Sequence, residues 1–153
     1  MNYAEAVEIV KAARENGVFL MEAFMYRCHP QIQKLVELMQ DAAIGKTHLV
    51  RATFGYQSEF DPTSRTYNHE MGGGSILDIG CYTASVVPLI AGAAEKKLFL
   101  DPATIKGSGN VRPTGVDHPA AATIQFENGI IAEIISAIST TLRVVYLSMA
   151  RTA

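Results

Sequence analysis

The sequence lacks the features that define several specialised classes of protein. Only two cysteines occur in 153 residues, Cys28 and Cys81, and their spacing fits no disulfide framework, so free thiols in a reducing cytosol are expected. The formal net charge is −2 and no basic run occurs, which argues against a nucleic-acid partner. No apolar run approaches the roughly 20 residues that cross a bilayer, and the N-terminus is unlike a signal peptide. We therefore expect a cytoplasmic globular protein without a membrane partner.

Three catalytic or binding motifs are also absent. The glycine cluster at residues 72–74 has neither the spacing nor the upstream strand of the dinucleotide-binding loop G-x-G-x-x-G. Structural zinc needs four ligands at short spacings, which Cys28, His29 and Cys81 do not supply, so no metal is expected. No serine lies in a G-x-S-x-G elbow, and a hydrolase is correspondingly disfavoured.

The first part of the chain predicts helices and strands in alternation. Asn2 and Glu5 form a capping-box pattern ahead of a helix that ends at Gly17. The continuous apolar run at residues 18–21 is typical of a strand buried on both faces, as in a parallel sheet. Pro30 fits the first turn of a second helix, and residues 48–57 then alternate as in a strand with one buried face.

After a polar loop at residues 61–74, a third helix is predicted over about residues 75–91. The side chains expected to face inward are Ile76, Ile79, Thr83, Val86 and Ile90. Pro88 is expected to kink the last turn of this helix. Short strands follow at residues 98–100 and 104–108, and the Asn128-Gly129 pair predicts a type I′ hairpin between strands at 120–126 and 130–139. The predicted fold class is α+β: an open, mainly antiparallel sheet with helices on one face, preceded by a helix–strand stub of an α/β unit.

Asp78 and Tyr82 are four residues apart on the third predicted helix, directly after the glycines. This spacing places them on one face, one turn apart, where a carboxylate beside a phenol suits proton transfer. The alternative is a surface helix pair that contributes a few tenths of a kcal/mol to stability.

Two separated segments, residues 22–30 (Glu-Ala-Phe-Met-Tyr-Arg-Cys-His-Pro) and 72–82, resemble the glucose–fructose oxidoreductase/inositol dehydrogenase/MocA-like family. The likeness is strongest to its dimeric dihydrodiol dehydrogenase and D-xylose dehydrogenase branch, and it runs from residue 2 to about 138, including residues 112–117. The resemblance implies an enzyme that oxidises or reduces sugars and related polyols with NAD or NADP. It also implies an N-terminal Rossmann domain followed by a domain built on an open antiparallel sheet.

The same resemblance implies roles for individual residues. Tyr82 matches the family's general acid/base, and Asp78 matches the aspartate that orients the substrate or the tyrosine. Tyr26, Arg27 and His29 match the segment that lines the nicotinamide side of the cleft. The alternative for this segment is purely structural: His29 caps the helix that follows it, and Arg27 pairs with Glu22 or Glu70.

The chain departs from the family where the cofactor chemistry lies. It has no glycine-rich turn and no lysine in a Glu-Lys-Pro tripeptide ahead of the first helix, and residues 140–153 do not continue with the family's strand and last helix. We therefore predict a remnant of the dinucleotide-binding domain at residues 1–24 and a C-terminally truncated substrate and oligomerisation domain at residues 25–153. Alone, such a fragment is expected to be inactive and to bind no cofactor tightly.

Several other residues favour plain structural roles. His48, His69 and His118 are predicted to be surface or hydrogen-bonded loop histidines, and Arg65 and Tyr67 to be solvated loop residues, although both could touch a substrate. An alternative function is a non-catalytic association module. Apolar side chains occupy both faces of the last predicted strand, which favours a homo-oligomer formed through the sheet. These are Ile130, Ile134 and Ile138 on one face, and Ile131 and Ile135 on the other.

Overall fold

The computed structural model describes the backbone of residues 2–151 and the side-chain burial of residues 2–143. The helical elements are α1 (Tyr3–Glu15), the 3₁₀ turn η1 (Met25–Cys28), α2 (Pro30–Gln40), the 3₁₀ turn η2 (Arg65–Tyr67), the π-helical turn η3 (Ile76–Gly80) and α3 (Cys81–Ala93). The strands are β1 (Lys46–Gln57), β2 (Thr104–Val111), β3 (Asp117–Gln125), β4 (Ile131–Ala137) and β5 (Ser139–Arg151).

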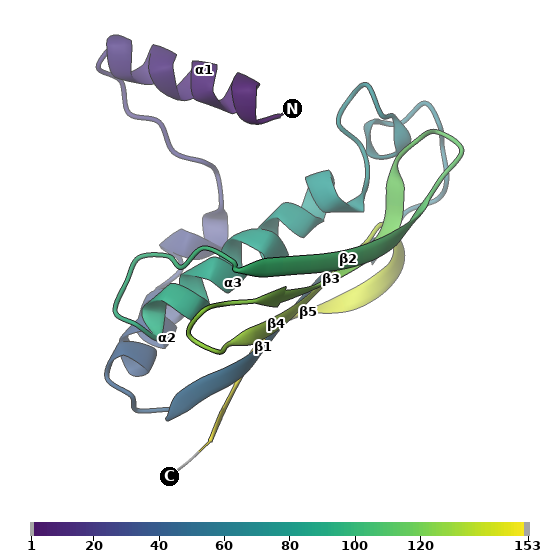
Figure 1. Ribbon diagram of the computed structural model, residues 1–153. Coiled ribbons are helices and arrows are strands. Elements are labelled where there is room, and N and C mark those ends of the chain that lie inside the picture. Colours follow the sequence, from purple (N-terminus) through teal and green to yellow (C-terminus); the bar gives the residue numbers. More distant parts are fainter. Residues whose placement is uncertain (1, 152–153) are drawn as a thin grey trace.

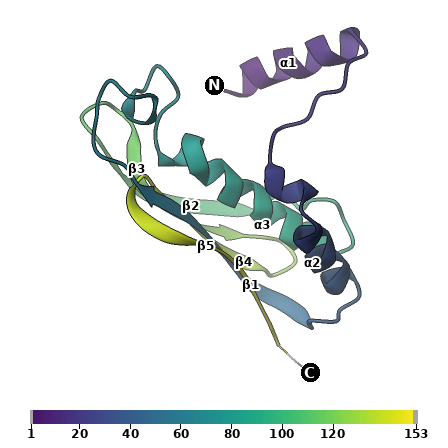
Figure 2. The ribbon, with the colours of Figure 1, turned by 180° about the vertical axis from the view of Figure 1, so that it is seen from behind.

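The five strands form one open sheet in the order β2-β3-β4-β1-β5. β1 runs parallel to β4, whereas the β1–β5, β2–β3 and β3–β4 pairs are antiparallel. α2 and α3 lie on the same face of this sheet (Figures 1 and 2). The predicted α+β class, with a mainly antiparallel sheet and helices on one face, is confirmed.

The core lies between α3 and the middle of the sheet. Val50 and Ala52 point inward from β1, as their alternation predicted, and both are fully buried. Val86 and Ile90 of α3 belong to the same buried cluster. Burying a side chain of this size contributes roughly 1.5–3 kcal/mol, so the β1–α3 contact holds the helix layer in place.

The predicted capping box of α1 is present, because the Asn2 side chain accepts from the Glu5 amide while the Glu5 carboxylate accepts from the Asn2 amide. No residue of α1 is buried, and the helix stands away from the sheet in Figure 1. The prediction of a buried strand at residues 18–21 is wrong. This segment has no strand partner and its side chains are exposed, 88% in the case of Phe19, because no sheet lies beside it in the described chain.

Three smaller predictions are also wrong. Residues 98–100 form no strand. The turn at residues 126–129 is not type I′, because Gly129 has a positive φ of 85° but Asn128 does not. Ile76 is 51% exposed rather than inward. An i+4 repeat assumes a regular α-helix, and the π turn at η3 shifts that register.

The end of the described chain pairs with the sheet edge. β5 runs antiparallel to β1 from Ser139, which lies opposite Gln57, to Arg151, which lies opposite Lys46. Residues 139–151 therefore form a strand where the sequence predicted an altered tail; residues 152 and 153 lie outside the described residues. By length and composition, the stretch Ile76–Ala93 could cross a membrane, but 56% of it is buried inside the fold, as in the core helix of a globular domain.

Candidate active site

The candidate site is built around the start of the η3–α3 helix. Gly73 and Gly74 bring the chain into this helix by close backbone contact: their amides donate to the carbonyls of Asn68 and Thr66 at 2.9 Å each. A Cβ on Gly73 would lie 2.6 Å from the carbonyl oxygen of Thr66, so only glycine fits. Gly74 has a φ of 106°, which also favours glycine. The glycine cluster therefore fixes where the helix begins.

Asp78 lies within the π turn and is held at both carboxylate oxygens. The hydroxyl of Tyr56 on β1 donates to Oδ2 at 2.5 Å, and the guanidinium of Arg65 on η2 donates to Oδ1. The Asp78 side chain is only 11% exposed, whereas that of Arg65 is 58% exposed. The hydrogen bond to the Asp78 carboxylate raises the pKa of Arg65 above its ordinary value. Burial, and then the hydrogen bond to Asp78, raise the pKa of Tyr56 above its ordinary value.

Tyr82 lies in the first turn of α3 and is half-buried between two aromatic rings. The centroid of its ring lies 5.4 Å from that of Phe24, with an angle of 74° between the ring planes. The corresponding values for Phe54 are 5.6 Å and 61°, and both pairs pack edge to face. Such pairs contribute about 0.5–1.5 kcal/mol each beyond the area they bury. Within the part of the chain that the structure describes, the Tyr82 hydroxyl has no hydrogen-bond partner, and it does not bond Asp78.

Tyr26 and Arg27 of η1 converge on Ser85, one turn beyond Tyr82. The Tyr26 hydroxyl lies 2.7 Å from Ser85 Oγ, and Arg27 donates to the same oxygen at 3.0 Å. The guanidinium of Arg27 also stacks over the ring of Phe99 at 4.6 Å. Its Nε is buried without a partner among the described residues. Arg27 therefore does not pair with Glu22 or Glu70.

His29 lies outside this cluster and caps α2. Its Nδ1 accepts from the Gln31 amide at 3.2 Å, and Pro30 occupies the first turn, as the sequence predicted. The capping alternative for His29 is thus confirmed, and the structure leaves its other ring nitrogen at an exposed position.

The loop ahead of η3 contains a buried tyrosine. Tyr67 is fully buried, and its hydroxyl lies 2.9 Å from the Ser58 carbonyl and 3.2 Å from that of Ile138. The prediction of a solvated Tyr67 is therefore wrong.

His118 bonds Ser139 Oγ through Nδ1 at 2.8 Å. Burial of the ring, and then the nearby charge of Arg112, lower the pKa of His118. It is hydrogen-bonded, as expected, but it lies in β3 and not in a loop.

The cysteines are unpaired, as predicted: Cys28 is exposed and Cys81 is half-buried. Burial raises the pKa of the Cys81 thiol, which makes it a poorer nucleophile. Among residues 2–151, no group of three or more histidine, cysteine, aspartate or glutamate side chains is placed to hold a metal ion.

Sequence reasoning missed three members of the site: Tyr56, Phe24 and Ser85. Tyr56 lies 22 residues before Asp78, and Ser85 lies 59 residues after Tyr26. No local spacing connects such pairs. The one available signal was the alternation of residues 48–57, which placed Tyr56 on the face of the strand that carries α3.

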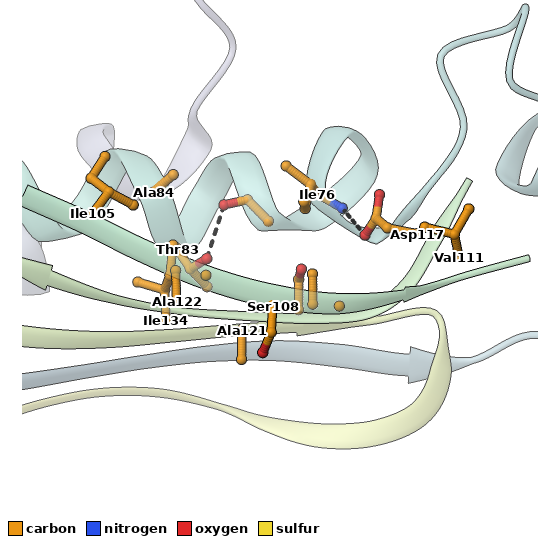
Figure 3. Close-up of a pocket in the computed structure, with 15 residues that line it drawn as sticks. Ile76, Thr83, Ala84, Ile105, Ser108, Val111, Asp117, Ala121, Ala122 and Ile134 are labelled. Carbon is orange, nitrogen blue, oxygen red and sulfur yellow. Dashed lines mark hydrogen bonds between the residues drawn. The ribbon is translucent and has the colours of Figure 1, made fainter. Parts of the chain in front are cut away.

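A separate apolar cavity of about 450 Å³ lies on the other side of α3, over β2 and β3 (Figure 3). Gly80 and Ala84 line it from the helix. Each is two positions from Tyr82, and because successive helical residues are rotated by about 100°, they face nearly the opposite way. The cavity and the Tyr82 site therefore lie on different faces of one helix.

The family model of the GFO/IDH/MocA C-terminal domain matches residues 32–146. Trans-1,2-dihydrobenzene-1,2-diol dehydrogenase of Xenopus tropicalis is 34% identical over 142 residues, covering 93% of this chain and 41% of the relative. D-xylose 1-dehydrogenase (NADP(+)) 2 of Haloferax volcanii is 26% identical over 136 residues, covering 89% of this chain and 39% of the relative. The chain thus spans about two fifths of the length of these relatives.

Solved structures share the fold. A 3-ketoreductase from Actinomadura kijaniata in complex with NADP and TDP-benzene superposes with a TM-score of 0.79 at 24% identity, over 97% of this chain and 44% of that chain. An aldose-aldose oxidoreductase from Caulobacter crescentus complexed with glycerol gives a TM-score of 0.76 at 23% identity, over 90% of this chain and 41% of that chain. At this identity the likeness establishes the architecture alone.

Proposed function

Since the chain belongs to the GFO/IDH/MocA C-terminal domain family, we propose that it provides the substrate side of the active site of an NAD(P)-dependent oxidoreductase. The substrate class is a sugar or a related polyol or diol, which the dihydrodiol and xylose dehydrogenase relatives support. Activity requires a nucleotide-binding domain that carries a G-x-G-x-x-G loop and a lysine in a Glu-Lys-Pro tripeptide, and residues 1–153 contain neither motif.

The observation that carries this proposal is the state of the Tyr82 hydroxyl. The hydroxyls of Tyr26, Tyr56 and Tyr67 all bond other groups of the fold. That of Tyr82 bonds none of the groups that the structure describes, although its ring is fixed by Phe24 and Phe54. A rigid phenol with an unoccupied hydroxyl is suited to exchange a proton with a bound molecule.

Oxidation of an alcohol releases a hydride from carbon and a proton from oxygen. NAD(P)⁺ supplies the hydride acceptor when it is bound. In our proposal the oxygen of Tyr82, as the phenolate, receives the hydroxyl proton and becomes the neutral phenol, assisted by a lysine outside this chain. In the reverse direction the Tyr82 hydroxyl returns the proton to the developing alkoxide. Positioned proton transfer of this kind accelerates a reaction typically 10²–10⁴-fold.

Asp78 has the complementary task of holding the substrate. An ionised carboxylate offers about four lone-pair sites, and Tyr56 and Arg65 occupy one on each oxygen. The remaining lone pairs are available to a substrate hydroxyl. Because the carboxylate is held from two sides, its direction is fixed before the substrate arrives.

Among the proposed cofactor-binding residues, Arg27 fits best. A guanidinium has five N–H donors, and the bond to Ser85 engages only one of its nitrogens, so donors remain for a polar group of a ligand. Tyr26 already bonds Ser85, and His29 caps α2, so these two would shape the cleft more than bind. With these groups alone, we expect no tight NADP(H) binding by the isolated chain.

A fusion protein tests the proposal. The segment of the Xenopus tropicalis dehydrogenase that precedes its matched region is joined ahead of residue 2, and NADPH formation is followed with a dihydrodiol, D-xylose and a panel of polyols. We expect turnover by the fusion, none by the isolated chain, and loss of turnover in Tyr82→Phe but not in the exposed control Tyr3→Phe. A folded, NADP-binding fusion that turns over none of these substrates would refute the proposal.

A second candidate function is self-association through the uncovered face of the sheet. Ile131 is 43% exposed there, and Leu49 and Ile135 are half-buried beside it. Exposed apolar strands of this kind favour pairing with a second copy. We propose a homo-oligomer in a reducing, cytoplasmic setting, which the unpaired cysteines support.

Sedimentation at tens of micromolar tests the assembly. We expect a dimer or larger species that Ile131→Lys dissociates and that the control Ile105→Lys, on the exposed edge strand β2, leaves intact. A monomer for the unmodified chain would contradict the proposal.

A further inference from the structure

We infer that Asp117 is a positioning residue for the site: its carboxylate fixes the start of the η3–α3 helix and thereby the direction in which Asp78 presents its carboxylate. This inference rests on the proposed function for its purpose. The geometry that supports it involves only residues of this chain.

Asp117 begins β3 and makes its contacts at the first turn of η3. Its Oδ2 accepts from the Ile76 amide at 3.0 Å (Figure 3). The same oxygen accepts from the Ser75 hydroxyl. Ser75 is fully buried and does not cap the helix with its own side chain. The amides of a first helical turn lack partners within the helix and carry partial positive charge. A carboxylate from a strand 41 residues away therefore takes the place of a local cap.

The same contact extends into the sheet. Ser75 Oγ lies 3.0 Å from Ser136 Oγ and 3.2 Å from the Ser136 carbonyl on β4. Ser75 is thus tied to two strands at once, by Asp117 on β3 and by Ser136 on β4. A buried polar set of this kind allows few arrangements, because each alternative leaves a group unsatisfied.

Gly74 makes room for this arrangement. A Cβ built on Gly74 would lie 2.5 Å from Asp117 Oδ1, so any side chain at this position would require Asp117 to move. The Gly74 amide donates to Thr66, next to Arg65, and its carbonyl accepts from the Asp78 amide at 3.0 Å. One glycine therefore contacts Asp117 and links the segments that carry Arg65 and Asp78.

Moving Asp117 should consequently move Asp78 relative to its partners. The π turn that contains Asp78 starts at Ile76, whose amide Asp117 holds. If that anchor is lost, the first turn frays and Asp78 no longer meets Tyr56 on β1. A cap that merely stabilised the helix would leave the Asp78–Tyr56 contact as it is.

The test uses the 153-residue chain with Asp117→Asn, which keeps the size of the side chain, and the matched control Asp101→Asn at an exposed position. Amide hydrogen exchange reports the anchor at Ile76, and carbon-13 NMR titration of labelled tyrosine reports the contact between Tyr56 and Asp78. In Asp117→Asn we expect exchange at Ile76 to accelerate by about 10- to 100-fold, and the pKa of Tyr56 to fall toward its value in urea-unfolded chain. Asp101→Asn should change neither.

Three outcomes would overturn the inference. Faster exchange at Ile76 with an unaltered Tyr56 pKa would make Asp117 a cap without a positioning role. No change in either readout would remove the anchor altogether. Faster exchange throughout the β1–β4 ladder, for example at Val50 and Ala132, would make Asp117 a residue of general stability. No readout involves cofactor or substrate, so these results are independent of whether the fusion protein is active.

Discussion

Tyr56 on β1 donates a 2.5 Å hydrogen bond to Oδ2 of Asp78, which lies in the π turn ahead of α3. This bond joins the central sheet to the helix that carries Tyr82. It determines that the Asp78 carboxylate points toward β1 and η2, where Arg65 meets its other oxygen.

Tyr56→Phe removes this donor and keeps the ring. We expect the free energy of unfolding to fall by about 1–2 kcal/mol, because a part-buried carboxylate loses one of its two partners. Urea unfolding at pH 7 measures the change. Tyr3→Phe is the control, since Tyr3 is 86% exposed, and it should shift the midpoint by less than about 0.5 kcal/mol.

The raised pKa of Tyr56 also predicts a pH dependence of stability. The neutral phenol is favoured in the fold, so the unfolded chain ionises first, near its ordinary pKa of about 10. The stabilisation is complete below that pH and is lost as the pH rises through the higher folded pKa. Urea midpoints measured across this alkaline range should fall more steeply for the unmodified chain than for Tyr56→Phe. Parallel curves would contradict this prediction.

Ser85→Ala should destabilise the fold more than its size suggests. Removal of the hydroxyl takes away two hydrogen bonds at once, the one with the Tyr26 hydroxyl and the one with the Arg27 guanidinium. A hydrogen bond contributes about 0.5–1.5 kcal/mol, and one to a charged group such as the guanidinium about 1.5–3 kcal/mol. Urea unfolding of Ser85→Ala, compared with Ser108→Ala on the exposed strand β2, measures the difference. Equal midpoints would show that the Ser85 contacts contribute nothing.

Comparing Gly74→Ala with Gly129→Ala separates two reasons for a glycine: the lack of space for a Cβ and the positive φ of the backbone. Gly74 and Gly129 both have positive φ, 106° and 85°, but only at Gly74 would a Cβ meet another atom. Strain from a positive φ alone costs roughly 1–2 kcal/mol, which is the expected loss for Gly129→Ala. Gly74→Ala should lose more, because Asp117 must also move. Equal losses for the two variants, measured by thermal unfolding, would show that Asp117 has room to shift.

Tyr82→Phe should separate stability from activity. Its ring contacts with Phe24 and Phe54 remain, and its hydroxyl bonds no described residue, so the unfolding midpoint should shift by less than about 0.5 kcal/mol. In the fusion protein, kcat should fall by about 10²- to 10⁴-fold. A large loss of stability would instead assign the hydroxyl a structural role.

Local patterns determined much of this fold. The capping box at Asn2, the proline at the start of α2, the alternation along β1 and the position of α3 each depend on neighbours within a few residues. Such features are set by backbone hydrogen bonding and side-chain periodicity. The glycines, Asp78 and Tyr82 likewise marked the candidate site, because they lie within eleven consecutive residues.

Only the tertiary structure decided how that site is assembled. Tyr26, Tyr56, Arg65 and Asp117 reach the η3–α3 helix from other elements, and no spacing in the sequence pairs them with it. The apolar run at residues 18–21 shows the converse: its pattern is that of a buried strand, yet it remains exposed, because a strand forms only where a partner supplies hydrogen bonds and cover. The sequence by itself therefore determined which residues could act and where helices begin, whereas contacts between distant segments decided which of those residues meet.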